Sequence, residues 1–140
     1  MLALRERLHG QCVLCGANHP HGLRLRFSVH EDGHVESTCD CPRNWQGYTG
    51  HLHGGVISAL LDSAMTNCLF AHGHMGMTGE LKVRFLKPVL VEQSAVISAH
   101  LIESHGPLFC LSATLTQDNM LKARATAKFM QVAPATTIHS

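Results

Sequence analysis

The sequence has few charged residues and no long apolar run. Charged residues make up 15% of the 140 residues, compared with about 25% in an average soluble domain. A chain of this length has a large surface for its volume, so the low charge predicts that another subunit covers part of it. No apolar run reaches the roughly 20 residues that span a bilayer, and the first ten residues lack a signal-peptide core. These absences predict a cytoplasmic protein with no membrane partner.

Several other sequence features are missing as well. The net charge is +1 and no basic block or arm is present, which argues against a nucleic-acid partner. The chain has neither a glycine-rich phosphate loop nor a dinucleotide fingerprint. No repeat, linker or change of composition divides it, so we expect one domain over 1–140, with a core at about 12–131 and a loose tail at 132–140.

What the chain does contain is a series of periodic segments separated by turn residues. Two strands, one helix and four strands predict an α+β fold in which a curved, mostly antiparallel sheet wraps one long helix. An Asp-Gly pair is expected to turn between the first two strands. In order, we expect a helix over 2–9, a loop over 10–22, strands over 23–30 and 35–41, a loop over 42–50, a helix over 54–70, and strands over 77–87, 94–104, 107–117 and 120–131.

The helix over 54–70 is apolar on nearly every side, and such a helix is expected to be buried on all sides. Asp62 interrupts it. An ionised carboxylate in apolar surroundings costs several kcal/mol unless it is paired. Ser58 and Thr66 lie one turn on either side, so this stripe of the helix is predicted to face a cleft. A structural aspartate that is hydrogen-bonded to a neighbouring strand is the alternative.

The helix begins with Gly54 and Gly55, where the first backbone N–H groups have no partners within the helix. Such amides can bind a carbonyl oxygen that gains negative charge during a reaction; a simple tight turn is the alternative. Gly54 and Asp62 are eight residues apart, about 12 Å at 1.5 Å per residue. That is too far for both to serve one carbonyl. A shared site therefore predicts a homodimer in which the turn and the acid come from different subunits.

Three segments resemble hotdog-fold acyl-CoA thioesterases of the phenylacetate-pathway (PaaI) type. They are "WQGYTGHLHGGVISALLDSAM" (45–65), "TGELKVRFLKPV" (78–89) and the Cys-rich "CVLCGANHPHGLRLRF" (12–27). The resemblance implies a long helix wrapped by a curved sheet, assembled as dimers or as dimers of dimers (tetramers). It also implies hydrolysis of an acyl-CoA or aroyl-CoA thioester to the free acid and CoA. No cofactor is implied beyond the CoA of the substrate.

By the same resemblance, Asp62 is the general base or the nucleophile, and Thr78 positions water beside it. The Gly54 amide polarises the thioester carbonyl, and His53 shapes the turn. Many relatives carry an Asn where this chain has Gly47, and Gln46 is a candidate substitute. The candidate substrate contacts are Gly55, Gln46, Gly47, Ser58, Thr66, Lys82 and Arg84. Further candidates for the CoA phosphates, or else ordinary solvated cations, are Lys87, Lys122, Arg124 and Lys128.

Three other interpretations stay open at this point. The four thiols of Cys12-x-x-Cys15 and Cys39-x-Cys41 match the ligand set of a four-thiolate zinc site, although small buried thiols give the same pattern. A hotdog dehydratase or hydratase would use His51 or His53 as its base. A non-catalytic hotdog protein would bind acyl-CoA or another small molecule without turnover, but would have little reason to keep Asp62.

Overall fold

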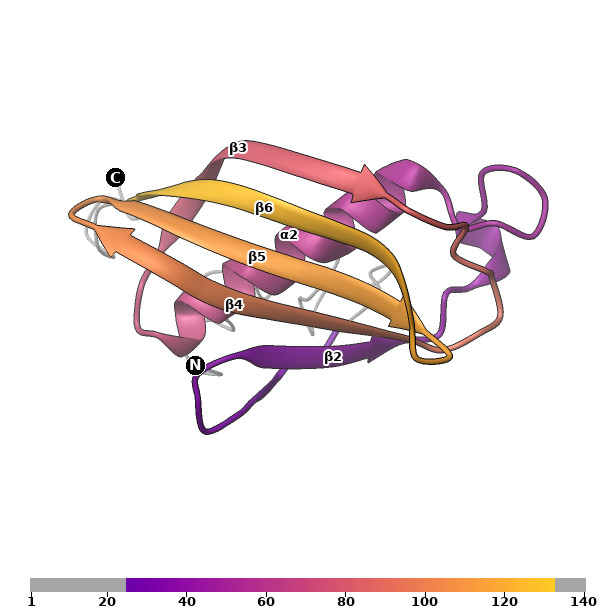
Figure 1. The fold of residues 1–140 in the computed structure, drawn as a ribbon, viewed down its shortest axis with the longest axis horizontal. Helices are drawn as coiled ribbons and strands as arrows, with labels where there is room; N and C mark the ends of the chain where they lie inside the picture. The colour runs from indigo at the N-terminus through magenta and orange to yellow at the C-terminus, as the bar shows by residue number, and fades with distance from the viewer. Residues whose placement is uncertain (1–24, 133–140) are drawn as a thin grey trace.

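The computed structural model describes residues 25–132, in which one α-helix lies against a single six-stranded sheet (Figure 1). The strand order is β1-β2-β4-β5-β6-β3, and all neighbouring strands are antiparallel. The predicted α+β architecture is confirmed. The elements are β1 (Ser28–Val29), β2 (Val35–Cys39), the 3-10 helix η1 (Arg43–Trp45), α2 (Gly54–Ala71), β3 (Gly76–Phe85), β4 (Ala95–His105), β5 (Leu108–Gln117) and β6 (Met120–Gln131).

The N-terminal predictions are only partly reproduced. The helix expected over 2–9, the loop over 10–22 and the tail from 133 onward lie outside the described residues, and the domain boundaries stay a prediction. The strand expected over 23–30 is much shorter, since only Ser28 and Val29 pair with β2. The predicted turn is present, with Gly33 at φ +88°. Strand β2 ends before Cys41 because that residue has φ +52° and leaves the sheet.

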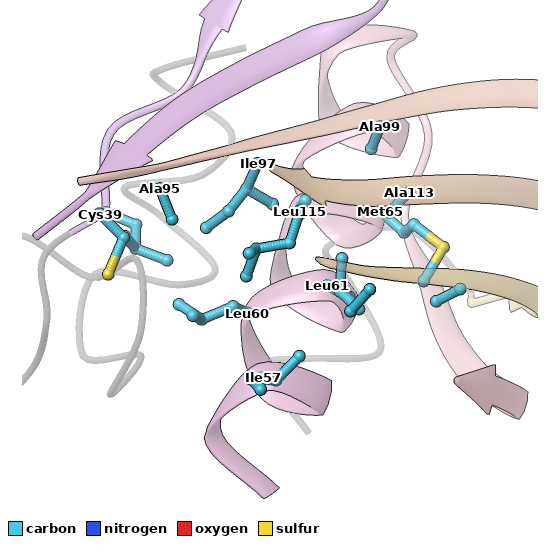
Figure 2. Packing of buried hydrophobic residues seen from close by; sticks show 14 of the residues in the cluster. Cys39, Ile57, Leu60, Leu61, Met65, Ala95, Ile97, Ala99, Ala113 and Leu115 are labelled. Atoms are coloured by element: carbon cyan, nitrogen blue, oxygen red, sulfur yellow. The ribbon is translucent and has the colours of Figure 1, made fainter. Parts of the chain in front are cut away.

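The core lies between α2 and the concave face of the sheet, and it combines large helix residues with small strand residues. Figure 2 shows Leu60, Leu61 and Met65 of α2 pointing toward the sheet, where Ala99 and Ala113 face them. Short alanine side chains let the helix approach the strands closely, so the long helix residues fill the space at native packing density. The other buried alanines of the sheet are Ala95, Ala123, Ala125 and Ala127.

The helix is not buried on all sides, which corrects the prediction. From Ser63 to Phe70 every residue is buried, but the N-terminal half is open along Gly55, Ser58 and Asp62. The helix is long and apolar enough, with a mean hydropathy of 1.3, to resemble a membrane span. Its packing under the sheet accounts for this apolar character, and Asp62 lies on the side that the sheet leaves uncovered.

The edge strand β3 carries a β-bulge that decides where Thr78 points. Thr78 pairs with Phe129 and Glu80 with Lys128, so Gly79 is the extra residue. Without a bulge, Thr78 would lie on the opposite face from Leu81, because side chains alternate along a strand. The extra residue brings Thr78 to the inner face, where Phe129 is buried. Bulges commonly re-aim a side chain in this way.

Candidate active site

The start of α2 is built by His53, which caps the helix. His53 has extended backbone angles, and its Nδ1 accepts a hydrogen bond of 2.8 Å from the Gly55 N–H. A Cβ atom at position 55 would lie 3.0 Å from that nitrogen, so glycine is needed for the ring to come this close. Within residues 25–132, the Gly54 N–H has no hydrogen-bond acceptor. This amide is therefore a donor available to a ligand at the positive end of the helix dipole.

The loop before the helix is tightly folded against His53. The Gly47 N–H donates to the His51 carbonyl at 2.9 Å, and a Cβ atom at position 47 would lie 3.3 Å from the His53 Cα. A side chain such as the Asn of many relatives would crowd the cap here. The Gln46 Oε1 accepts from the Gly50 N–H at 3.0 Å and holds the loop together, and its role as the substitute contact stays a prediction.

A pocket of about 370 Å³ opens beside the available amide. It is formed entirely by the loop before the helix and the first helical residue. Tyr48 contributes to the lining and is 87% exposed, which places it at the rim of the pocket. The pocket is lined by Gly47, Tyr48, His51, Leu52, His53 and Gly54. A group bound here would therefore lie against the Gly54 amide.

Asp62 and Thr78 meet on the open side of the helix. The Thr78 hydroxyl donates a hydrogen bond of 2.6 Å to Asp62 Oδ1. Asp62 is half-buried and Thr78 is exposed, so the pair lies at the surface of the single chain. The hydrogen bond fixes one carboxylate oxygen and leaves the other for a ligand or water.

The two polar neighbours of Asp62 on the helix differ in role. Thr66 is 9% exposed, and its hydroxyl donates to the Asp62 carbonyl oxygen at 3.0 Å. The Thr66 side chain is thus turned to its own helix in the single chain, and its role as a substrate contact stays a prediction. Ser58 is half-buried on the same open side as Asp62 and stays a candidate contact.

Lys82 and Arg84 lie on the outer face of the sheet, away from Asp62. They alternate with Leu81 and Val83, which pack against the core. Together with Arg124 they line a groove of about 490 Å³ across β3, β6 and β5. Within one chain the sheet itself separates these cations from the Asp62–Thr78 pair. The predicted substrate contacts therefore lie on two different faces of the sheet.

The cysteine hypothesis is only half visible in the structure. Cys12 and Cys15 lie outside the described residues, whereas Cys39 and Cys41 are buried in the core. A hydrogen bond with the Cys41 thiol lowers the pKa of Cys39 to about 7, and the same interaction raises the pKa of Cys41. Each sulfur also forms a hydrogen bond with the backbone of the other cysteine, at 3.4 and 3.7 Å, and the zinc site stays an untested alternative.

Two features near the site were not evident from the sequence. The Phe85 ring lies 3.6 Å from where a Gly54 Cβ would be, so the C-terminal end of β3 lies against the helix start. The bulge at Gly79 was not predicted either, although a lone glycine inside a strand pattern is its usual signal. Gly54 and Asp62 therefore lie beside opposite ends of the same edge strand.

Comparison with known proteins identifies the family. A family model described as the thioesterase superfamily matches residues 49–123. The chain belongs to the thioesterase superfamily. It is 31% identical over 91 residues to acyl-coenzyme A thioesterase THEM4 of Rattus norvegicus, a match that covers 64% of this chain and 39% of that protein. The chain thus spans about two-fifths of the length of that relative.

Solved structures confirm the hotdog fold expected from the resemblance. The PaaI protein of E. coli, from the phenylacetic acid degradation operon, has a TM-score of 0.73 at 14% identity, covering 79% of this chain and 81% of that one. A thioesterase of Streptococcus pneumoniae in complex with coenzyme A has a TM-score of 0.73 at 19% identity, covering 78% and 89%. That protein was also solved as two variants, in which a threonine and an aspartate sixteen positions apart were each replaced by alanine.

Proposed function

We propose that this chain hydrolyses an acyl-CoA or aroyl-CoA thioester to the free acid and CoA. The observation that carries the proposal is the Asp62–Thr78 pair on the open side of α2, on the same helix whose Gly54 amide is available as a donor. Relatives named acyl-coenzyme A thioesterases support it. The pair in this chain is separated by 16 positions, the same spacing as the two substituted residues of the Streptococcus pneumoniae protein.

The chemistry uses few groups. The Gly54 N–H binds the thioester oxygen and stabilises the negative charge that develops as the carbonyl is attacked. Asp62 acts in one of two ways: it removes a proton from the attacking water, or it attacks the carbonyl carbon itself. In both routes the C–S bond breaks, the CoA sulfur leaves and takes up a proton, and water supplies the oxygen of the acid. Thr78 holds the carboxylate in place.

We infer that the working site is shared by two copies of the chain. Strand β3 pairs only with β6 within the described residues, which leaves its other edge unpaired, and it exposes Met77 and Phe85. A two-fold axis through the middle of β3 would pair two copies of this edge antiparallel. The Phe85 end of one copy, with its Gly54, would then lie against the Thr78 end of the other, with its Asp62.

The dehydratase alternative that uses His53 as its base is less well supported, whereas His51 also lines the pocket and stays a candidate base. A dehydratase needs an imidazole nitrogen that can take up a proton. In His53 the Nδ1 already accepts the Gly55 N–H, so the neutral ring carries its proton on Nε2 and faces the pocket as a donor. His53 therefore serves as a cap here. The non-catalytic binder is tested directly by the presence or absence of turnover.

The test is release of free CoA thiol from a panel of acyl- and aroyl-CoAs. Asp62→Asn is expected to lower kcat by about 10²–10⁴-fold. Gly54→Pro removes the amide hydrogen and adds a ring, which the first helical position accommodates, and it is expected to lower kcat by about 10²–10³-fold. Gly54→Ala keeps the N–H, and its Cβ meets Phe85 at an ordinary 3.6 Å, so it serves as the matched control.

The outcomes separate the hypotheses. Turnover by the wild type that is lost in Asp62→Asn and Gly54→Pro, but kept in Gly54→Ala, supports the proposed site. Equal turnover in Asp62→Asn and wild type contradicts the role of the acid. Binding of acyl-CoA without release of thiol from any ester would favour the binder.

A further inference from the structure

Outside the candidate active site, three histidines form a row across the outer face of the sheet. The ring centroids of His30 and His34 are 4.1 Å apart, and those of His34 and His100 are 4.8 Å apart; the ring planes deviate by 8° and 14° from parallel. The strand register explains this row. Val29 pairs with Val35, and Val35 with Ala99. Because the strands are antiparallel, His30 after Val29, His34 before Val35 and His100 after Ala99 fall beside one another on the opposite face.

Two carboxylates accompany the row. Asp32, in the turn, is hydrogen-bonded to His34 Nδ1, and its Oδ1 also accepts the His34 backbone N–H at 3.0 Å. Glu36 follows His34 on the same face of the hairpin. Its Oε1 lies 3.9 Å from His30 Nε2, and its Oε2 lies 4.0 Å from His34 Nε2. Three potential ligand atoms, two imidazole nitrogens and one carboxylate oxygen, thus lie within 4.8 Å of one another.

The contacts of His34 assign different roles to the two acids. Since Asp32 binds the Nδ1 side, the proton of the neutral ring lies there, and the Nε2 lone pair is directed toward Glu36. A carboxylate behind a histidine that orients its other nitrogen is the usual outer partner of a metal ligand. While His34 Nδ1 donates to Asp32, this nitrogen has no lone pair for an ion, so the neighbouring group of Asp32, His34 and His100 is the less suitable one.

We propose that His30, His34 and Glu36 bind a divalent transition-metal ion of the zinc class, with Asp32 orienting His34. Imidazole nitrogen and carboxylate oxygen are ligands that zinc accepts at about 2.0–2.2 Å, which places neighbouring ligand atoms about 3.4 Å apart. The observed distances are 3.9 and 4.0 Å, and because the stacked rings of His30 and His34 direct their in-plane lone pairs side by side, binding requires the His30 ring to turn out of the stack. The side chains of His30 and Glu36 are 44% and 42% exposed, which leaves room for it, and water fills the remaining position.

The position of the site predicts what the ion does. Strand β1 is held by only two residue pairs, and the tip of its turn touches α2 where the Gly33 carbonyl accepts from His72 Nε2 at 3.2 Å. His30 directly follows β1, whereas His34 directly precedes β2 and Glu36 lies in β2. An ion bound by these three residues would therefore join the end of β1 to β2. The ion would therefore stabilise this hairpin, independently of the chemistry at Asp62.

The experiment titrates zinc chloride into the full chain after chelator treatment, by calorimetry, and repeats the titration with Co²⁺ while recording absorption. His34→Ala and Glu36→Gln remove ligands, and circular dichroism checks that both variants fold. His105→Ala is the matched control, because His105 forms a similar imidazole–carboxylate pair with Glu103 at 2.9 Å on another hairpin. We expect one bound ion, weakened about 10–100-fold or more in the two ligand variants and unchanged in the control.

Co²⁺ absorption also distinguishes this site from the cysteines. Nitrogen and oxygen ligands give visible bands without the strong sulfur-to-metal band of a thiolate site. Equal zinc affinity in wild type, His34→Ala and Glu36→Gln would overturn the proposal. So would a thiolate band that accounts for all bound cobalt, or no binding at millimolar zinc.

Discussion

At the scale of single residues, Thr78 contributes one hydroxyl group to the candidate site. Its 2.6 Å bond to Asp62 is a hydrogen bond to a charged group, worth about 1.5–3 kcal/mol. Thr78→Val keeps the shape of the side chain and removes the bond, so we predict that kcat falls about tenfold or more. The measurement is CoA release at saturating ester. Thr78→Ser, which retains the hydroxyl, should stay near the wild-type rate; equal rates for Ser and Val variants would contradict the role.

The buried side chain of Gln117 stabilises the fold through its hydrogen bonds to a neighbouring loop. It is 2% exposed, its Oε1 accepts the Leu90 N–H at 2.8 Å, and its Nε2 donates to the Leu90 and Gln93 carbonyls at 2.8 and 3.2 Å. The side-chain amide thus pairs with the loop as another strand would. Because Gln117→Ala leaves these buried groups without partners, we predict a loss of about 2–4 kcal/mol in the free energy of unfolding.

Urea denaturation of Gln117→Ala measures that loss. The control is Gln131→Ala, since this glutamine is exposed on β6 and surface substitutions usually change stability by less than about 0.5 kcal/mol. A Gln117→Ala variant as stable as this control would show that water replaces the three bonds.

At the scale of elements, the closeness of β3 and α2 depends on glycine at the start of the strand. A Cβ atom at Gly76 would lie 3.0 Å from Leu69 Cδ1 and 3.2 Å from the Met130 carbonyl oxygen, whereas at Gly79 its nearest neighbour would be at 3.5 Å. Overpacking of this kind costs about 1–3 kcal/mol. We predict that Gly76→Ala lowers the melting temperature and that Gly79→Ala, at an ordinary contact distance, changes it much less. Thermal unfolding followed by circular dichroism compares the two variants, and equal melting temperatures would contradict the tight packing.

The same strand shows how an element positions a functional group. The helix that carries Asp62 and the strand that carries Thr78 were both evident from their periodicity. The bulge at Gly79, which turns Thr78 inward, depends on the pairing of β3 with β6. Pairing between strands distant in sequence cannot be read from one strand alone, so the contact between the two residues needed the folded sheet.

At the scale of the whole molecule, a site shared between copies makes a prediction that a self-contained site does not. We mix and co-refold equal amounts of Asp62→Asn and Gly54→Pro, each inactive alone. If two copies share each site, half of the dimers combine the variants and each of these has one intact site, so about a quarter of the wild-type rate returns. Thiol release before and after mixing measures the recovery. No recovery, with mixed dimers verified by a tag on one variant, would contradict the shared site.

Periodicity and turn residues in the sequence were enough to predict the order of the strands and helix within residues 25–132, and a largely apolar helix that carries one carboxylate. Periodicity, turn residues and the cost of burying a charge are local properties, and each can be read within a few neighbouring positions. The motif over residues 45–65 was also enough to indicate the family, because it includes both the capped helix start and Asp62.

The tertiary structure decided which side of the helix stays open, that Thr66 is buried while Thr78 reaches Asp62, and that Lys82 and Arg84 lie on the other face of the sheet. It also placed His30, His34 and Glu36 close together, and it showed that the Gln46 side chain accepts a hydrogen bond from Gly50 within its own loop. These facts depend on strand register and on contacts between distant segments. A change of one residue in register moves every side chain of a strand to the opposite face, and only the folded sheet sets that register.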